Sequence, residues 1–316
     1  MSNKKIVTGE HVAAIDLGTN SCRVLVADIK GNDVFRDVRH VALGEGLAES
    51  GLFCDVAIKR AVNAFSDFSK ILKKYNVKKY RAIATAACRM SSNTNDFLSK
   101  VKEVSHVDVD VISEYEEARL TLKGAKLNAP KDKKYLFVYD LGGGSTEITL
   151  ATNEANPKIL ATISIPLGAR NATEIFNLED YNHMGATRLI DDVKRYMNKF
   201  KKQIEDIDYK GNTALVATSS TPLRLAAWLT NMDTYDKFRA DGVTVTTQAL
   251  DDLIANVLMM DYKKRLHSVY IGKCRAKIFV AALIIFRAIY QELEATELTA
   301  SLKSAQEAIV AELVGN

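Results

Sequence analysis

The 316-residue sequence is poor in the residues that build disulfide frameworks, metal clusters and linkers. Its 4 cysteines, at positions 22, 54, 88 and 274, are too scattered for a zinc site or a redox pair, so we expect small buried thiols in a reduced compartment. With 4 prolines and 16 glycines there is little material for a long linker, so the two domains that this length favours should abut. The 5 histidines lack the spacing of a metal site.

Long hydrophobic runs and a strong charge are absent as well. The longest apolar run, Ile278 to Phe286, is half of what a membrane span needs, and the first ten residues contain no apolar core of a secretory signal. The net charge of +4 is weaker than that of a typical nucleic-acid-binding protein of this size. We therefore expect a cytoplasmic globular protein with neither nucleic-acid nor membrane partners.

A strand–turn–strand pattern occurs twice in the chain. The first copy is AIDLGTNS at 14–21, followed by an apolar run at 22–27; the second is VYDLGGGS at 138–145, followed by 146–151. The small turn residues let backbone N–H groups approach an anion, and the hydroxyls of Thr19, Ser21, Ser145 and Thr146 can donate to phosphate oxygens. Asp16 and Asp140 stand where each first strand ends, a position that suits Mg²⁺ or a water.

One such loop on its own is more often a plain β-turn, but two copies in the same context favour phosphate binding. The loops are not dinucleotide fingerprints, because a β-type run rather than a helix follows the glycines at 142–144. They are not Walker loops either, since no Lys-Ser or Lys-Thr follows the glycines.

The remaining patterns predict two α/β halves. Strands are expected at 11–17, 21–29, 33–42, 81–85, 107–111, 135–141, 145–151, 159–165 and 213–217. Helices are expected at 55–75, 96–104, 113–126, 168–177, 182–203, 221–231, 248–259, 274–293 and 301–314. The segment NAPKDKK at 128–134 reads as the junction, which gives domains at 1–127 and 128–300. We expect a C-terminal helix at about 301–316 to pack back on the first domain.

A series of ordered motifs over about residues 12–170 resembles the exopolyphosphatase/guanosine pentaphosphate phosphatase family. The motifs are DLGTNS at 16–21 with Arg23, LGEGL at 43–47, ATAACR at 84–89, VIS at 111–113 with EEARL at 116–120, DLGGGSTE at 140–147 and SIPLG at 164–168. The resemblance implies a duplicated actin-like fold, shared with sugar kinases and Hsp70 ATPases and related to ribonuclease H, with two domains around a cleft. It also implies removal of terminal phosphate from inorganic polyphosphate or guanosine pentaphosphate with Mg²⁺, or alternatively Mn²⁺, and a homodimer.

The resemblance also implies roles for single residues. Glu117 matches the general base that activates the attacking water. Asp140 and Glu147 match the acidic residues around the metal and the water, and Asp16 takes the equivalent place in the first loop. Arg23 and Arg89 match arginines that face the anionic substrate, Arg89 within the catalytic group. The residues matching the phosphate-holding loops are Thr19, Asn20, Ser21, Gly142, Gly143, Gly144, Ser145 and Thr146.

These assignments agree with the needs of phosphoryl transfer, which depends on positioning and on neutralising charge. Purely structural interpretations exist beside them. Glu114, Glu116 and Glu117 open a helix, where carboxylates favour the dipole without any catalytic task. Asp16 and Asp140 can cap turns, and Arg23 and Arg89 can be surface or ion-paired residues.

The second half departs from the family in three places. Ser219-Ser220-Thr221 replaces the usual Gly-Gly-Thr, Arg275-Ala276-Lys277 replaces Arg-Ala-Asp, and the usual Gly-Leu-Arg-Glu-Gly near the C-terminus is absent. We therefore expect either a changed substrate preference or weakened turnover. The main alternative function is a sensor that binds guanosine tetra- or pentaphosphate with little turnover. An ATP-dependent kinase or filament-former is disfavoured by Glu116-Glu117-Ala118-Arg119 and by the lack of adenosine-loop glycines.

Overall fold

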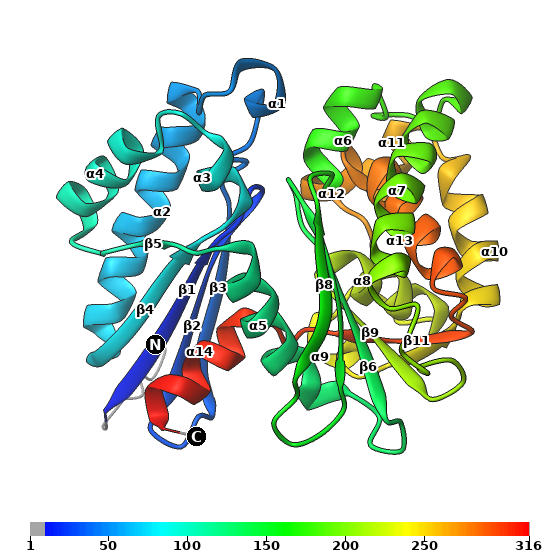
Figure 1. Ribbon diagram of the computed structural model, residues 1–316. Coiled ribbons are helices and arrows are strands. Elements are labelled where there is room, and N and C mark those ends of the chain that lie inside the picture. Colours follow the sequence, from blue (N-terminus) through cyan, green and yellow to red (C-terminus); the bar gives the residue numbers. More distant parts are fainter. Residues whose placement is uncertain (1–9, 316) are drawn as a thin grey trace.

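The computed structural model describes residues 10–315, in which two β-sheets stand side by side and helices cover them (Figure 1). Residues 1–9 and 316 lie outside the described residues. The prediction that the first ten residues contain no secretory signal therefore falls almost entirely outside them. The strands of the first sheet are β1 (His11–Leu17), β2 (Ser21–Asp28), β3 (Asp33–His40), β4 (Val77–Ala84) and β5 (Asp110–Val111). Those of the second are β6 (Tyr135–Leu141), β7 (Thr146–Thr152), β8 (Ile159–Ile165), β9 (Thr213–Thr218), β10 (Thr244–Thr246) and β11 (Glu297–Ser301).

The two sheets repeat one topology. The first has the order β3-β2-β1-β4-β5, and the second has β8-β7-β6-β9-β11 with β10 added at its edge. In both sheets the first two strands pair antiparallel, and the first strand pairs parallel with the fourth. This duplication confirms the expected α/β, actin-like fold. It places Asp16 at the end of β1 and Asp140 at the end of β6, the equivalent strands of the two sheets.

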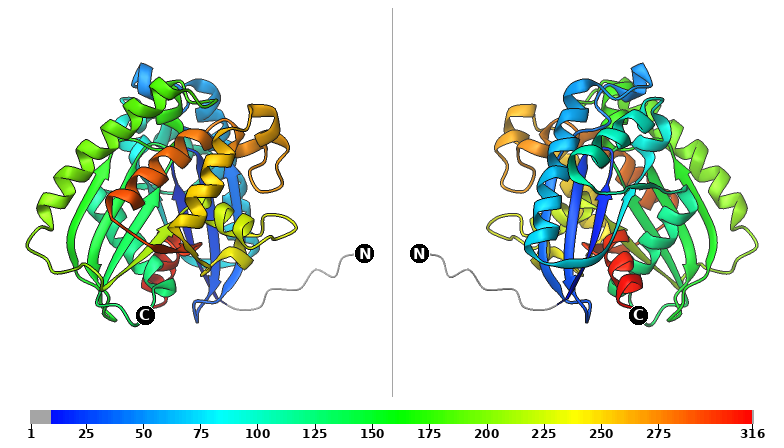
Figure 2. Two further views of the ribbon diagram at one scale, coloured as in Figure 1. Left: turned by 90° about the vertical axis from the view of Figure 1, so that its right-hand side faces the viewer. Right: turned by 90° about the vertical axis from the view of Figure 1, so that its left-hand side faces the viewer.

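Most helices lie on the outer faces of the two sheets (Figures 1 and 2). The first half contains α1 (Leu47–Ser50), α2 (Asp55–Lys74), α3 (Ala86–Met90), α4 (Thr94–Ser105), α5 (Glu114–Ala125) and the 3-10 turn Lys126–Asn128. The second contains α6 (Ala169–Phe176), α7 (His183–Gln203), α8 (Ser220–Leu229), α9 (Lys237–Ala240), α10 (Thr247–Leu258), α11 (Tyr262–His267), α12 (Lys273–Ala276), α13 (Phe279–Glu292) and α14 (Ala305–Val314).

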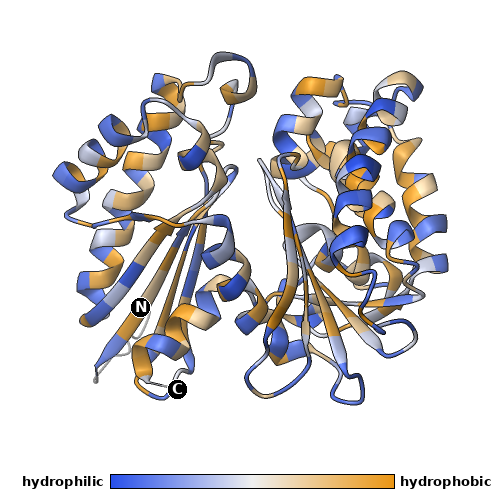
Figure 3. Cartoon of the chain, viewed as in Figure 1, coloured by the Kyte–Doolittle hydropathy of each residue, from blue (hydrophilic) through white to orange (hydrophobic). Residues whose placement is uncertain are grey.

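The long apolar run of the sequence forms the core of the second half. Residues 279–286 are all buried in α13, which packs against α7, α6 and α10 (Figure 3). No helix in residues 10–315 combines the length and the apolar character that crossing a membrane takes.

Two helices lie between the sheets. α14 packs on β1 and on α5, although it follows the last strand of the second sheet. On α5, Leu120 joins the core formed with α14 and the first sheet, whereas Leu122 joins a core with β6 and β9. The helices come so close that a Cβ on Gly124 would lie 1.9 Å from the backbone oxygen of Ser304. Each helix begins with a Ser-x-x-Glu sequence, Ser113 to Glu116 and Ser304 to Glu307, which satisfies N-terminal backbone groups.

The structure corrects several predicted elements. The alternating segment 107–111 forms a strand only at Asp110–Val111, since Val107 is buried without ladder pairing. The predicted helix at 274–293 is broken between α12 and α13. The predicted helix at 301–314 begins only at Ala305, and the residues before it form β11, which we had not predicted. Cys22 and Cys88 are buried as expected, but Cys54 and Cys274 are exposed.

Candidate active site

The two predicted phosphate loops, at 16–21 and 140–145, contact each other where β1 and β6 end. A Cβ on Gly144 would lie 2.7 Å from Oγ1 of Thr19, and a Cβ on Gly143 would lie 3.1 Å from Cβ of Asn20. Glycine at these positions lets the loops approach this closely, because a side chain would crowd Thr19 and Asn20. The second loop is also held from behind by α6, where the backbone N–H groups of Ala169 and Arg170 donate to the carbonyls of Gly142 and Gly143 at 2.9 and 2.8 Å.

Residues of both loops line a small cavity of about 70 Å³, and we call it the interloop cleft. Most of the residues predicted for the site converge there, although they come from three separate parts of the chain. The lining residues are Asp16, Gly18, Thr19, Asn20, Ser21, Arg23, Thr85, Ala86, Glu117, Asp140, Leu141, Gly142, Gly143, Gly144, Ser145, Ser219 and Arg275.

Two carboxylates face the interloop cleft from equivalent strand ends. Burial raises the pKa of Asp16 and that of Asp140, and the charge of Asp140 raises the pKa of Asp16 further. Arg23 opposes this effect for both groups and lies 3.8 Å from the Asp16 carboxylate. A pair of close, partly uncompensated carboxylates is a set of donors that fits a divalent cation completed by water and substrate phosphate oxygens. Within residues 10–315, no cluster of three or more His, Cys, Asp or Glu side chains is arranged to hold a metal without such help.

Glu117 reaches the interloop cleft from the first turn of α5. The N-cap Ser113 fixes this turn by accepting a hydrogen bond from the backbone N–H of Glu116. Burial raises the pKa of Glu117 to about 7, and the nearby charges of Asp140 and Asp16 add to that shift while Arg89 opposes it. A buried carboxyl with a pKa near neutrality is suited to accept a proton from water.

Three of the predicted residues lie behind the cleft instead of lining it. Arg89 donates through Nη1 to Glu117 Oε2 at 2.8 Å and to the Ile112 carbonyl at 3.0 Å, so it holds the carboxylate. The Thr146 hydroxyl donates to the Leu167 carbonyl at 2.7 Å. Glu147 is buried and accepts a hydrogen bond from Ser164 at 3.0 Å. Burial, Glu117 and Asp140 raise its pKa well above the usual value, which favours a neutral carboxyl.

The structure adds two arginines that the sequence reasoning did not place at the site. Arg275 lines the interloop cleft from α12, at the position where the Arg-Ala-Lys motif had drawn attention only to its lysine. Arg170 is buried and donates through Nη2 to the Asn20 side-chain oxygen at 2.7 Å, so it joins the two phosphate loops. Lys277, the lysine of the Arg-Ala-Lys motif, does not line the interloop cleft. Its ammonium group forms an ion pair with Glu179, with 2.8 Å between Nζ and Oε1.

The sequence profile of the Ppx/GppA phosphatase family matches residues 25–316. The chain belongs to the Ppx/GppA phosphatase family. It is similar to the bifunctional 3-dehydroquinate synthase/phosphatase of Fusobacterium nucleatum, with 30% identity over 76% of this chain and 37% of that protein. It is also similar to exopolyphosphatase 2 of Mycobacterium tuberculosis, with 35% identity over 52% of this chain and 54% of that protein. The matches thus span about half or less of these two relatives.

A solved structure of an exopolyphosphatase from Cytophaga hutchinsonii shares the fold. It superposes with a TM-score of 0.88 over 96% of this chain and 98% of that chain, at 22% identity. The two-sheet architecture of this chain is therefore also the architecture of that solved protein.

Ser219 stands where the sequence resemblance leads us to expect glycine. Its backbone has φ 88° and ψ −179°, a region that only glycine adopts without strain of about 1–3 kcal/mol. The strained residue precedes α8 and borders the interloop cleft.

We expect Ser219→Gly to be more stable than Ser219→Ala by about 1 kcal/mol. Glycine relieves the backbone strain, whereas alanine keeps the Cβ and removes only the hydroxyl. Chemical denaturation of both variants measures the difference in free energy of unfolding. Equal stabilities would show that Ser219 is not strained.

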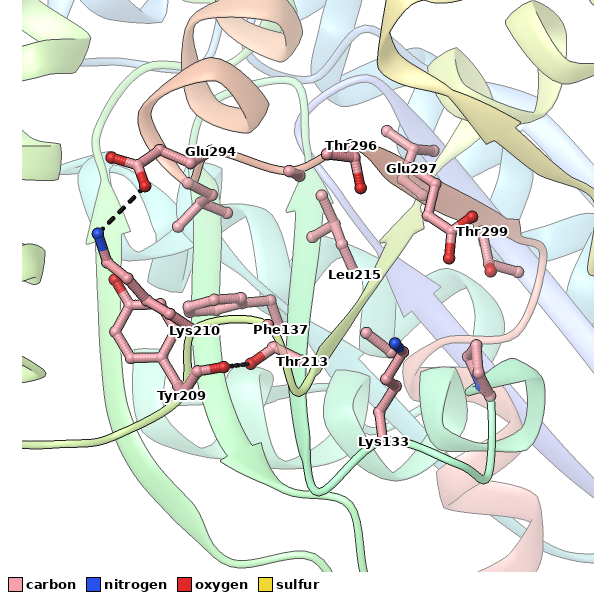
Figure 4. Close-up of a pocket in the computed structure, with 16 residues that line it drawn as sticks. Lys133, Phe137, Tyr209, Lys210, Thr213, Leu215, Glu294, Thr296, Glu297 and Thr299 are labelled. Carbon is pink, nitrogen blue, oxygen red and sulfur yellow. Dashed lines mark hydrogen bonds and ion pairs between the residues drawn. The ribbon is translucent and has the colours of Figure 1, made fainter.

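A second hollow of about 230 Å³ lies at the opposite end of the second sheet (Figure 4). It occupies the space where β9 and β11 diverge, because their pairing begins only at Val216 and Thr299. Lys210 and Glu294 form an ion pair of 3.1 Å beside it. None of its lining residues belongs to the interloop cleft.

Proposed function

We propose that this protein hydrolyses the terminal phosphate of inorganic polyphosphate or guanosine pentaphosphate. The observation that carries the proposal is the position of Glu117, whose carboxyl has a pKa of about 7 and lines the same small cleft as both phosphate loops. The exopolyphosphatase among its relatives supports the same chemistry. Dimerisation and a cytoplasmic location remain predictions from the sequence.

In this mechanism the loops position the terminal phosphate and Glu117 activates a water. The water oxygen forms a bond to the terminal phosphorus while the bond to the bridging oxygen breaks, and the water proton passes to Glu117. Arg89 orients the Glu117 carboxylate through its 2.8 Å contact. Backbone N–H groups of the loops and the guanidinium groups of Arg23 and Arg275 neutralise the charge on the phosphate oxygens.

Asp16 and Asp140 are the residues that we propose to hold Mg²⁺, with Mn²⁺ as the alternative cation. When bound, such a cation would neutralise phosphate charge beside the reacting atoms. Glu147 does not line the interloop cleft and has a raised pKa, so we assign it a supporting position behind Glu117.

Phosphate release from the purified protein tests the proposal. The substrates are long polyphosphate, tetrapolyphosphate and guanosine pentaphosphate, each with and without Mg²⁺, and the control is Glu117→Gln. Release that depends on Mg²⁺ and on Glu117 would support the hydrolase, and the ranking of rates would identify the substrate. Tight binding of guanosine pentaphosphate without release from any substrate would favour the sensor instead.

The pKa of Glu117 predicts a pH profile. The group must be deprotonated to accept the water proton, so we expect kcat/KM, which reports the free enzyme, to rise through about pH 7. Because Arg89 lowers the pKa of Glu117, Arg89→Met is expected to shift this rise to higher pH, and Arg89→Lys to shift it less. Initial rates at substrate concentrations well below KM, measured between pH 5 and 9, give the shift in kcat/KM. Coincident profiles for the wild type and Arg89→Met would exclude this role for Arg89.

A further inference from the structure

Arg170 is buried in the first turn of α6, at the boundary between the two domains. Helix α6 belongs to the second domain, yet it contacts α1 of the first, and the two helices face each other in Figure 1. Arg170 does not line the interloop cleft. Any effect that it has on a phosphate group in that cleft must therefore pass through other residues.

Arg170 forms hydrogen bonds to both predicted phosphate loops. Its backbone N–H donates to the Gly143 carbonyl of the second loop at 2.8 Å. Its guanidinium donates to the side-chain oxygen of Asn20 in the first loop, from Nε at 3.1 Å and from Nη2 at 2.7 Å. The loops contact each other beside this bridge, because a Cβ on Gly143 would lie 3.1 Å from Cβ of Asn20. One residue thus ties the two loops together across the domain boundary.

Asn20 is held by the first domain in its other directions. Its carbonyl oxygen accepts from the backbone N–H groups of Val41 and Ala42, at 3.1 and 3.0 Å. Its side-chain nitrogen lies 3.3 Å from Nδ1 of His40. Burial, with the charge of Arg170, lowers the pKa of His40 to about 4, so at neutral pH the ring is uncharged and can accept this N–H. The amide oxygen of Asn20 is therefore directed toward Arg170, and a pull on it reaches the backbone of the first loop.

The charge of Arg170 is only partly compensated. Its ion pair with Glu174 is loose, at 3.8 Å between Nη1 and Oε1. Burial lowers the pKa of Arg170, and the nearby charge of Arg60 adds to this shift while Glu174 and Glu45 oppose it. A buried ion with incomplete pairing contributes little to the stability of a fold. What Arg170 supplies is the forked contact with Asn20.

We propose that Arg170 is a positioning residue that aligns the two phosphate loops across the domain boundary. By holding Gly143 through its backbone and Asn20 through its side chain, it keeps the domains in the arrangement in which both loops can contact one phosphate group. The effect of Arg170 on the reaction rate rests on the proposed function. Its effect on the arrangement of the domains requires no substrate.

The rate of phosphate release is the first measurement. We expect Arg170→Met to lower kcat/KM about 10–100-fold, because a small displacement of one loop misaligns the reacting groups. Arg170→Lys keeps the charge but loses the fork, so its loss should be smaller. Arg188→Met is the matched control. Arg188 is exposed on α7 and lies 5.7 Å from the centre of the Phe176 ring of α6, away from both loops, and its replacement should leave kcat/KM unchanged.

A double replacement separates positioning through Asn20 from a general structural effect. If Arg170 acts through Asn20, the double variant Arg170→Met, Asn20→Ala should lose no more kcat/KM than the more damaged of the two single variants. Losses that multiply in the double variant would show that Arg170 acts by another route, and they would overturn the proposal.

Distances between spin labels measure the arrangement of the domains without substrate. Cys54 is exposed just before α2 in the first domain, and Met184 is 72% exposed in α7 of the second. The labels are attached at Cys54 and at Met184→Cys, and Cys274→Ser removes the other exposed cysteine. We expect Arg170→Met to lengthen or broaden the distance distribution and Arg188→Met to leave it unchanged.

The free energy of unfolding shows whether a variant has lost its fold or only the alignment of its loops. Arg170→Met replaces an incompletely paired buried cation by an apolar side chain, so we expect a stability no lower than that of the wild type. If Arg170→Met does not fold, Arg170→Lys undergoes the same tests, with smaller expected changes in the same directions.

The two proposals fail in different ways. Phosphate release by the wild type, together with unchanged kcat/KM and an unchanged label distance in folded Arg170→Met, would refute the role of Arg170 and leave the hydrolase standing. A longer or broader distance distribution in Arg170→Met, without release from any substrate by the wild type, would refute the hydrolase and support the alignment of the domains by Arg170.

Discussion

Replacing Glu117 by glutamine is expected to lower kcat for phosphate release about 10²–10⁴-fold. The amide keeps the size and the contact with Arg89, but it cannot accept a proton from water. Loss of kcat with a similar KM would show that the side chain acts in the transition state and not in substrate binding. The measurement is the rate of phosphate release at saturating substrate.

Glu114→Gln is the matched control for this prediction. Glu114 lies in the same first turn of α5, but it is exposed and does not line the interloop cleft. It should retain nearly full activity. Equal activity of Glu117→Gln and the wild type would remove Glu117 from the mechanism, and equal losses in both variants would point to the helix terminus instead.

Glu117→Gln is also expected to change the stability of the fold, and the raised pKa of Glu117 determines the direction of the change. The folded-state pKa of Glu117 is raised from 4.5 to about 7, so the folded protein binds the extra proton between those values and becomes less stable as pH rises through them. Above pH 7 the buried carboxylate is charged at a cost in stability. Glu117→Gln removes that cost, and we expect it to unfold at a higher denaturant concentration than the wild type at pH 8.

Most of the fold could be predicted from the two copies of the strand–turn–strand pattern. A duplicated strand–turn–strand pattern is visible in the sequence because both copies place an aspartate before small turn residues, and the structure places Asp16 and Asp140 at equivalent strand ends. The strands β10 and β11 were not predicted, because at 3 and 5 residues they are too short to show a clear alternating pattern. The duplication itself was a signal for β11. Ser304 to Glu307 repeats the helix start at Ser113 to Glu116, and each helix follows the last parallel strand of its sheet.

Site residues are harder to predict where side-chain direction decides their contacts. Sequence motifs indicated Arg89 and Thr146 as substrate contacts, but only the structure shows that the first holds Glu117 and the second bonds to the Leu167 carbonyl. Arg170 reaches the first loop from the second domain, so no spacing along the chain indicates its position.

Replacing Gly168 by alanine is expected to lower kcat/KM for phosphate release about a hundredfold. Gly168 precedes α6, and a Cβ there would lie 2.5 Å from the carbonyl carbon of Gly143, 2.6 Å from the nitrogen of Gly144 and 2.7 Å from that of Ser145. These are backbone atoms of the second phosphate loop, so the loop must move to relieve the overlap. A displacement approaching 1 Å would misdirect the N–H groups that we propose to hold the phosphate.

The effect on the loop can be separated from a general loss of stability. Overpacking at Gly168 should cost about 1–3 kcal/mol, which the free energy of unfolding measures directly. Gly18→Ala in the first loop is the comparison, because its Cβ would meet only the Ser21 carbonyl oxygen at an ordinary 3.5 Å, and we expect a much smaller loss of kcat/KM. If folded Gly168→Ala kept wild-type kcat/KM, the packing of α6 against the second loop would not set the position of the phosphate. The loop would then owe its geometry to its contact with Thr19 and Asn20 across the cleft.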